Sequence, residues 1–308
     1  MVNVLLFPGQ GAQKVGMGKD LAERFPAARD TFAAIDAALG EPLTRLMWEG
    51  PEDRLQLTEH AQPAILAHSA AVLAVVRERL GPVAAAAGHS LGEYSAYLAA
   101  GLLPAVEVAK LVRKRGELMR AAGERRPGSM AAVLGLATDQ VERACRECST
   151  ESELAVPANL NTADQTVISG DPPAVERAGA ACKAAGAKRV LPLKVSGAFH
   201  SPLMAPAAAG LRAVLAEAPL ADPEFPVVAN ATAEAVRSAS AARTLLGEQL
   251  TSPVRWVECA QQLSALAPGA RFVELGPGNV LSGLVRRIVP GAQCISLGTA
   301  AEVEGVLA

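Results

Sequence analysis

The chain has 308 residues, half of them hydrophobic, with 29 Lys and Arg against 31 Asp and Glu. This balanced charge argues against a nucleic-acid-binding protein, which would have a basic domain, and no apolar run is long enough to span a membrane. The length exceeds one typical domain, although α/β folds reach this size as one body with an insertion.

Cysteine and histidine usage bears on compartment and metal content. The five cysteines are an odd number, and the apolar start at residues 2–7 is too short for a signal sequence, so we expect reduced thiols in a cytoplasmic protein. Cys145 and Cys148 form a C-x-x-C pair within a charged helical pattern, without a second pair. The four histidines also lack ligand spacing. We therefore expect no metal and no resident cofactor.

The first predicted element is a buried strand over residues 2–7, followed by a glycine-rich loop over 8–13. Such a loop can bind a nucleotide, but Lys14 stands where the dinucleotide fingerprint needs glycine, and no Gly-Lys-Ser/Thr follows. The alternative is a loop whose main-chain N–H groups point at a ligand, with Gln10 as the candidate donor. Helices are predicted over 20–39 and 63–80, and we interpret His68 in the second as non-catalytic.

A run of alanines then leads into Gly88-His89-Ser90-Leu91-Gly92 and on into a helical segment. This order is typical of a nucleophile elbow, a sharp strand-to-helix turn that exposes a serine hydroxyl. Side chains at Gly88 and Gly92 would collide where the backbone turns. Ser90 would lie at a helix N-terminus, which favours developing negative charge. Because Gly-x-Ser-x-Gly also occurs by chance, an ordinary turn remains the alternative.

The next predicted helix, over 104–122, carries an arginine on its apolar side. Its apolar stripe consists of Val108, Leu111, Val112 and Met119. Arg115 follows Leu111 by four residues and falls within that stripe. A buried guanidinium stays charged and must meet an anion. The anion could be a protein carboxylate or a substrate carboxylate, and the helix leaves both open.

Residues 127–196 change pattern and predict a small inserted domain. Strands are expected over 129–136, 154–160, 165–169 and 188–195, with helices over 139–148 and 173–185. This βαββαβ order is the ferredoxin-like arrangement. We therefore predict an α/β protein: an α/β-hydrolase-like large domain over 1–126 and 197–308, with a ferredoxin-like subdomain over 127–196.

A serine nucleophile needs a base, and His200 is the best candidate by elimination. It follows the last strand of the insert among small neighbours, whereas His89 is expected to point away from Ser90 and His60 lies beside a helical run. No acid stands out, because Asp139, Asp164 and Asp171 all fall in the insert. A main-chain carbonyl is the alternative partner for the imidazole. Further helices and strands are predicted over 206–218, 227–230, 272–275 and 280–288.

With these pieces located, the chain resembles the malonyl-CoA:acyl-carrier-protein transacylases and the acyltransferase domains of polyketide synthases along nearly its full length. The matching stretches are 7–13, 62–64, 88–94, 115–116, 159–161, 197–201, 249–250 with 253–254, and 276–281. Many matches in the same order are far more specific than the elbow alone.

The resemblance implies roles for individual residues. It implies a Ser90–His200 dyad steadied by a main-chain carbonyl near Gln249, and an oxyanion hole from the N–H groups of Gln10 and Leu91. It implies that Arg115 binds the malonyl carboxylate. The pairing of Leu91 with Phe199 is similar to the malonyl-selecting pattern. The predicted substrate-binding residues are thus Arg115, Gln249, Phe199 and Met119, with Asn159 and Asn161 as supporting residues.

The activity implied is ping-pong transfer of malonyl from malonyl-CoA to the phosphopantetheine thiol of an acyl carrier protein, in fatty-acid or polyketide synthesis. We expect a monomer without nucleic-acid or membrane partners. A serine hydrolase and a non-catalytic scaffold are the alternatives. Because such carriers are acidic, a basic cluster on the helix over 104–122 and just beyond it is either a docking face or an ordinary solvated surface. Its members are Arg113, Lys114, Arg120, Arg125 and Arg126.

Overall fold

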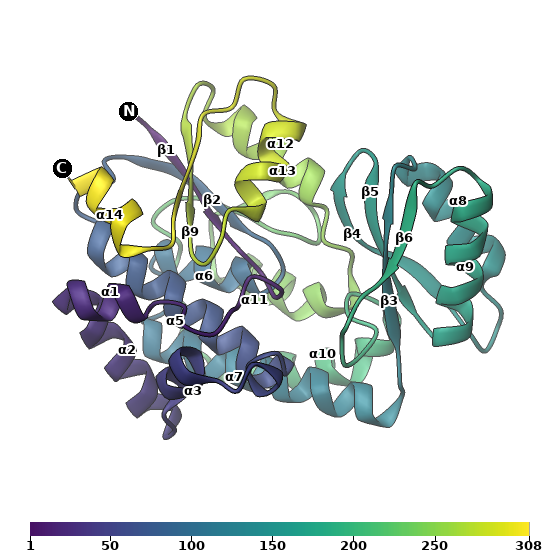
Figure 1. The fold of residues 1–308 in the computed structure, drawn as a ribbon, viewed down its shortest axis with the longest axis horizontal. Helices are drawn as coiled ribbons and strands as arrows, with labels where there is room; N and C mark the ends of the chain where they lie inside the picture. Colours follow the sequence, from purple (N-terminus) through teal and green to yellow (C-terminus); the bar gives the residue numbers. More distant parts are fainter. Residues whose placement is uncertain (308) are drawn as a thin grey trace.

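A computed structural model describes residues 1–307 and shows a large and a small domain, each built on its own sheet (Figure 1). The large sheet has the strand order β10-β9-β1-β2-β7-β8. Its strands are β1 (Asn3–Phe7), β2 (Val83–Gly88), β7 (Val227–Val228), β8 (Ala235–Val236), β9 (Arg271–Leu275) and β10 (Cys294–Leu297). All neighbours are parallel except β7 and β8. Phe7 pairs with Gly88, so the glycine-rich loop and the elbow leave the sheet at the same carboxyl edge.

Side-chain alternation along β1 explains why helices cover both faces of this sheet. Leu5 and Phe7 join one core cluster, whereas Val4 and Leu6 join the other. The first cluster packs against α1 (Lys19–Arg24), α2 (Pro26–Leu39), α3 (Leu43–Glu49), α4 (Glu52–Leu55), α5 (Thr58–Val76), α6 (Leu91–Ala99), α7 (Ala105–Arg125), α10 (Ala205–Glu217), α11 (Ala239–Glu248) and α14 (Ala300–Leu307). The second packs against α12 (Trp256–Leu266) and α13 (Val280–Ile288).

The small domain has an antiparallel sheet with the order β4-β5-β3-β6 and both of its helices on one face (Figure 1). Its elements are β3 (Ser129–Leu134), α8 (Thr138–Cys148), β4 (Ala155–Thr162), β5 (Gln165–Gly170), α9 (Pro172–Ala184) and β6 (Arg189–Pro192). This order and connectivity are ferredoxin-like. The predicted fold class is confirmed, while the exact boundaries at 126/127 and 196/197 stay a prediction.

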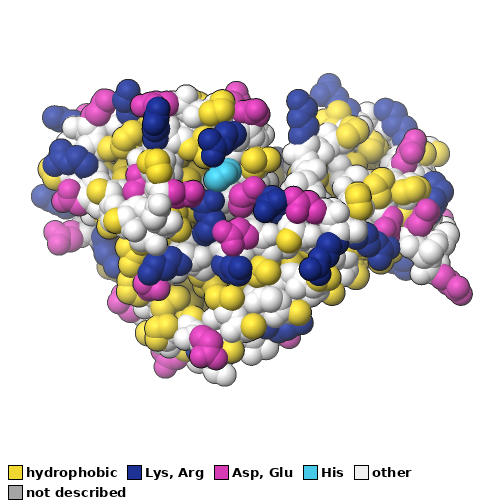
Figure 2. Space-filling model, turned by 90° about the horizontal axis from the view of Figure 1, so that it is seen from below, with side chains coloured by type: hydrophobic (Ala, Val, Ile, Leu, Met, Phe, Trp, Pro, Cys, Tyr) yellow, Lys and Arg dark blue, Asp and Glu magenta, His cyan; other side chains and the backbone are white. Residues whose placement is uncertain are grey.

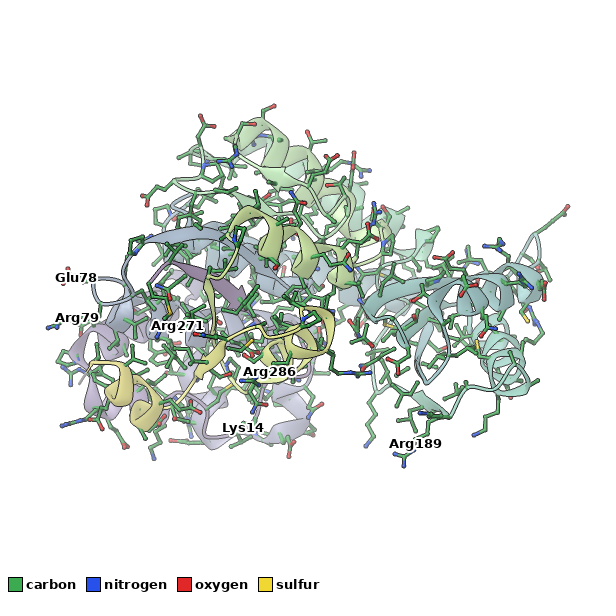
Figure 3. The ribbon with its side chains drawn as sticks, turned by 90° about the horizontal axis from the view of Figure 1, so that it is seen from above. Lys14, Glu78, Arg79, Arg189, Arg271 and Arg286 are labelled. Carbon is green, nitrogen blue, oxygen red and sulfur yellow. The ribbon has the colours of Figure 1, made fainter. Side chains whose placement is uncertain are left out.

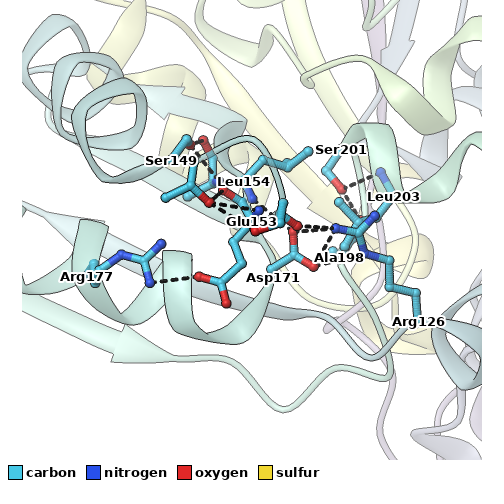
Figure 4. A network of polar contacts seen from close by, with 12 residues as sticks. Arg126, Ser149, Glu153, Leu154, Asp171, Arg177, Ala198, Ser201 and Leu203 are labelled. Carbon is cyan, nitrogen blue, oxygen red and sulfur yellow. Dashed lines mark hydrogen bonds and ion pairs between the residues drawn. The ribbon is translucent and has the colours of Figure 1, made fainter.

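A charged contact ties the small domain to the end of α7. Arg126 binds both carboxylate oxygens of Asp171, at 2.9 and 2.8 Å, and Asp171 also accepts a hydrogen bond from the N–H of Leu154 (Figure 4). Within the small domain, Arg177 binds Glu153 at 2.8 Å. The helix that carries Arg115 is therefore anchored to the inserted domain.

The structure also differs from the predicted element bounds. The helix predicted over 20–39 is two helices, because Pro26 starts a new one. The strand predicted over 188–195 ends at Pro192, after which Leu193 and Val195 line a cavity. The short helices α3 and α4 were not predicted. Among residues 1–307, no helix is both long and apolar enough to cross a membrane.

Candidate active site

The elbow has the backbone conformation that its glycines predict. Ser90 stands between β2 and α6 with φ 53° and ψ −106°, a region that residues with side chains rarely adopt. A Cβ on Gly88 would lie 1.9 Å from the carbonyl of Gly92, and one on Gly92 would lie 2.0 Å from the oxygen of Phe7. The strand and helix that the motif requires are both present, so Ser90 is not in an ordinary turn.

His200 faces Ser90 and is oriented by main-chain carbonyls. Its Nε2 lies 2.7 Å from Ser90 Oγ, and its Nδ1 lies 3.0 Å from the oxygen of Gln249 and 3.2 Å from that of Ser252. Because carbonyls only accept, Nδ1 carries the hydrogen and Nε2 is left to take the serine proton. Burial, together with the nearby charge of Arg115, lowers the pKa of His200 to about 3, so the imidazole is neutral near pH 7.

None of the three aspartates considered from the sequence serves as the acid. Asp171 binds Arg126 and Asp164 binds Arg287, both away from His200. Asp139 lies in the first turn of α8, inside the small domain. The carbonyl of Gln249 takes the place of an acid because the loop at 249–252 passes beside the imidazole.

Arg115 is 1% exposed and reaches Ser90 from α7. Its Nη2 donates to Ser90 Oγ at 3.0 Å and to Gln249 Oε1 at 2.9 Å, and its Nη1 donates to Gln62 Oε1 at 2.6 Å. All of these partners are neutral, and within residues 1–307 no carboxylate lies at ion-pair distance from the guanidinium. The predicted alternative of a protein carboxylate partner is not what the structure contains.

A cavity of about 310 Å³ opens onto these groups, lined by residues of both domains. The predicted residues on its wall are Gln10, Ser90, Leu91, Arg115, Met119, Asn159, Phe199 and His200. Gln249 is not part of this wall: its side chain is buried behind Arg115 and contacts it directly. Gln249 would therefore act on an acyl group indirectly, by holding the guanidinium of Arg115 in place.

The two residues whose N–H groups the resemblance implies as an oxyanion hole, Gln10 and Leu91, both line the cavity. The loop that carries Gln10 packs tightly on the elbow, since a Cβ on Gly9 would lie 2.3 Å from the oxygen of His89. Leu91 is the first residue of α6, where N–H groups have no partner within the helix. Neither the N–H of Gln10 nor that of Leu91 makes a hydrogen bond within the described chain, and both residues line the cavity.

His89 lines the cavity but is bonded away from the nucleophile. Its Nε2 lies 2.9 Å from Asn161 Oδ1, and its ring lies 5.6 Å from that of Trp256. Asn161 thus fixes the imidazole next to the elbow, while Asn159 is part of the cavity wall. His60 accepts a hydrogen bond from Arg113, outside the cavity.

Three buried polar residues near Ser90 received no role from the sequence. Asn230 accepts from the N–H of Ser90 at 2.7 Å, Gln62 accepts from Arg115, and Glu93 accepts from Gln249 Nε2 at 2.7 Å. Gln62 and Glu93 lie inside matching stretches, and each is a buried polar residue on a helix whose buried residues are mostly apolar. That mismatch was the available signal; Asn230 offered none.

The basic cluster on α7 and just beyond it is largely neutralised by neighbouring carboxylates. Arg113 pairs with Glu41, Lys114 with Glu117, Arg120 with Glu59 and Glu124, and Arg126 with Asp171. Only Arg125 of the five is in no ion pair within residues 1–307. The solvated-surface interpretation fits this pairing better than a docking face.

His68 is buried in α5 and lines a different cavity from the one that contains Ser90 and His200. Burial lowers its pKa from 6.5 to about 4, so the folded state holds it neutral while the unfolded state takes up a proton below pH 6.5. This residue therefore contributes about 3 kcal/mol to the free energy of unfolding above pH 6.5, and the contribution is lost as the pH falls toward 4.

We expect His68→Gln to flatten the fall in unfolding free energy between pH 6.5 and 4, measured by urea denaturation. An unchanged pH slope in the variant would contradict this.

A nucleophile elbow on a parallel sheet, with a histidine on the serine hydroxyl and free N–H donors beside it, defines the class of serine enzymes that form an acyl-enzyme. The model of the acyl transferase domain family matches residues 4–301, and the chain belongs to this family. The resemblance stated from the sequence is thereby confirmed.

Two curated relatives and two solved structures narrow the comparison. The chain is 42% identical over 303 residues to the malonyl CoA-acyl carrier protein transacylase of Salmonella typhimurium, covering 98% of this chain and 97% of the relative. It is 45% identical over 284 residues to the protein of the same description from Bacillus subtilis, covering 92% and 89%. An acyl carrier protein S-malonyltransferase from Vibrio cholerae superposes with a TM-score of 0.93 at 42% identity, over 99% of both chains. A type II polyketide synthase acyl carrier protein in complex with its malonyl-transacylase matches with a TM-score of 0.95 at 42% identity, over 100% of this chain and 99% of that one.

Proposed function

We propose that this chain is a malonyl-CoA:acyl-carrier-protein S-malonyltransferase, acting in fatty-acid or polyketide synthesis through an acyl-enzyme on Ser90. The observation that carries the substrate assignment is Arg115, a buried guanidinium that touches Ser90 Oγ and has only neutral partners in the described chain. A carboxylate-tailed acyl group on Ser90 would supply the missing anion through charge-assisted hydrogen bonds. A hydrolase of neutral esters has no use for such a group.

The proposed reaction has two half-reactions. His200 Nε2 takes the proton of Ser90 as Oγ attacks the malonyl thioester, and the tetrahedral oxyanion is held by the N–H groups of Gln10 and Leu91. The intermediate collapses as the coenzyme A thiolate leaves and takes the proton from His200. In the second half, His200 deprotonates the phosphopantetheine thiol of the carrier, which attacks the acyl-serine. The tetrahedral intermediate then collapses to malonyl-carrier, and Ser90 Oγ takes the proton back from His200 as the leaving group.

The chain itself holds every group that this scheme uses. Nucleophile, base, oxyanion donors and guanidinium are side chains or main chain of one molecule, which supports a reaction without a resident cofactor and a protein that works as a monomer. The five free thiols support the expectation of a cytoplasmic protein.

The direct test is the mass of the intact protein after mixing with malonyl-CoA. The wild type is expected to gain one malonyl group, which holo-carrier then removes, whereas Ser90→Ala gains none. Ser95→Ala is the matched control, because Ser95 is a buried serine one turn into α6 that does not line the cavity. An adduct that water removes as fast as carrier does would indicate a hydrolase, and no adduct at all would indicate a scaffold.

Carrier docking is expected at the notch between the domains, where basic side chains lie on both sides (Figure 2). Lys194 lines the cavity and is exposed, and Arg189 extends away from β6 (Figure 3). Within residues 1–307 neither is in an ion pair, unlike four of the five residues of the basic cluster on α7. An acidic carrier would be attracted to these free charges.

We therefore expect Lys194→Glu combined with Arg189→Glu to slow discharge of malonyl-Ser90 by holo-carrier about tenfold at low salt. Discharge by free pantetheine, an uncharged thiol, should stay at the wild-type rate. Arg79→Glu is the control, because Arg79 is an exposed arginine at the opposite end of the molecule (Figure 3). Equal slowing of carrier and pantetheine would place the effect in the site rather than in docking.

A further inference from the structure

Glu93 is a buried carboxylate beneath the nucleophile that the proposed reaction does not use. It is the third residue of α6 and 1% exposed. One oxygen, Oε2, accepts two hydrogen bonds: from the N–H of Asn230 at 3.0 Å and from Gln249 Nε2 at 2.7 Å. The other oxygen, Oε1, has no partner in the described chain. Oε2 therefore joins two residues that lie on separate segments after the inserted domain.

Both of those residues hold the main chain of the elbow. Gln249 Nε2 donates to the oxygen of Ser90 at 3.0 Å, and Asn230 Oδ1 accepts from the N–H of Ser90 at 2.7 Å. Asn230 Nδ2 also donates to the oxygen of Gly88 at 2.8 Å. The N–H and the carbonyl of Ser90 are thus bonded by the side chains of Asn230 and Gln249, and Glu93 accepts from the main-chain N–H of the first and the side-chain amide of the second. A backbone at positive φ costs about 1–3 kcal/mol and persists only when its surroundings enforce it.

Gln249 links the same carboxylate to the guanidinium. Its Oε1 accepts from Arg115 Nη2 at 2.9 Å while its Nε2 faces Glu93. An amide group can be placed in two orientations that differ by exchange of oxygen and nitrogen. With the carboxylate oxygen at 2.7 Å only one is favourable, since the other would direct the NH₂ group at the donors of Arg115 and the carbonyl at Glu93. By accepting from Gln249 Nε2, Glu93 Oε2 thereby turns Gln249 Oε1 toward Arg115, where it accepts a hydrogen bond from the guanidinium.

We propose that Glu93 is a positioning residue, which acts through Asn230 to hold Ser90 in its elbow conformation and through Gln249 to hold both Ser90 and Arg115. We assign the role to the acceptor at Oε2, because both hydrogen bonds of the carboxylate go to this oxygen. The negative charge of Glu93 also acts on Arg115, and a variant that keeps the acceptor without the charge separates the two effects. Burial also raises the pKa of Glu93 to about 7, which leaves the group partly protonated at neutral pH. A glutamine can place its carbonyl oxygen at the position of Oε2 and keep both contacts.

The experiment compares Glu93→Gln with Glu93→Met, which keeps the length of the side chain but removes the acceptor. Ser90 reactivity is measured as the labelling rate with a small neutral fluorophosphonate, and clamp function as the ratio of malonyl to acetyl loading from the CoA thioesters. Thermal midpoints report folding. We expect Glu93→Gln to stay within about threefold of the wild type in both. For Glu93→Met we expect labelling at least about tenfold slower and a malonyl-to-acetyl ratio about tenfold lower, because two buried donors lose their acceptor.

Two results would overturn the proposal: folded Glu93→Met with wild-type labelling and ratio, or Glu93→Gln as impaired as Glu93→Met, which would make charge the cause. If Glu93→Met does not fold, Asn230→Ala separates the effect on Ser90 through Asn230 from the effect on Arg115 through Gln249. It should slow labelling while the malonyl-to-acetyl ratio stays the same, and the opposite pattern would reject the linkage. The ratio rests on the proposed function, whereas labelling does not. A wild type that is labelled but never takes malonyl would therefore reject the function and leave the elbow role of Glu93 to its own test.

Discussion

Arg115→Ala is expected to lower malonyl loading of Ser90 about 100-fold while acetyl loading stays near the wild-type rate. The guanidinium is 1% exposed, and its hydrogen bonds go to Gln62, Gln249 and Ser90 rather than to a carboxylate. Removing one member of a buried charge pair costs about 2–5 kcal/mol, which corresponds to 100-fold at about 3 kcal/mol. An acetyl group has no carboxylate, so it loses nothing comparable.

The measurement is the rate of acyl-enzyme formation from each CoA thioester, followed by intact mass. Lys114→Ala is the control on the same helix, because its side chain is half exposed and pairs with Glu117 at the surface. Equal losses for malonyl and acetyl would mean that Arg115 supports Ser90 rather than the acyl carboxylate. Unchanged malonyl loading would remove the substrate assignment.

His200→Ala is expected to slow acylation by both thioesters by about 10²–10⁴-fold, the usual contribution of a general base. Ser90 Oγ would lose its acceptor at 2.7 Å and keep only the donor Arg115, which stabilises the oxygen but cannot remove its proton. Because the pKa of His200 is lowered to about 3, the wild-type imidazole is already in its basic form near neutrality.

His60→Ala is the matched control, since His60 contacts Arg113 outside the cavity and should leave acylation at the wild-type rate. The oxyanion donors are main-chain groups and survive the change at His200, so weak residual acylation is expected. Acylation by His200→Ala at the wild-type rate would show that another group takes the serine proton.

Local sequence patterns were enough for the parts of the site that depend on neighbours along the chain. The elbow at Gly88–Gly92 follows from steric demands within five residues, and a Cβ at either glycine meets backbone about 2 Å away. The burial of Arg115 follows from helical spacing on α7 alone. The βαββαβ order of the insert likewise needed only alternation and turn residues, and it set the fold class.

Tertiary structure decided what depends on segments far apart in the chain. Whether an acid or a carbonyl orients His200 is settled by the loop at Gln249, and that Arg115 has only neutral partners follows from how α5 and the 249–251 segment pack against α7. Glu93 and Asn230 are 137 residues apart, yet they share a hydrogen bond. Periodicity reports only which face of an element is buried, whereas the partner of a buried polar group is chosen by the packing of distant elements.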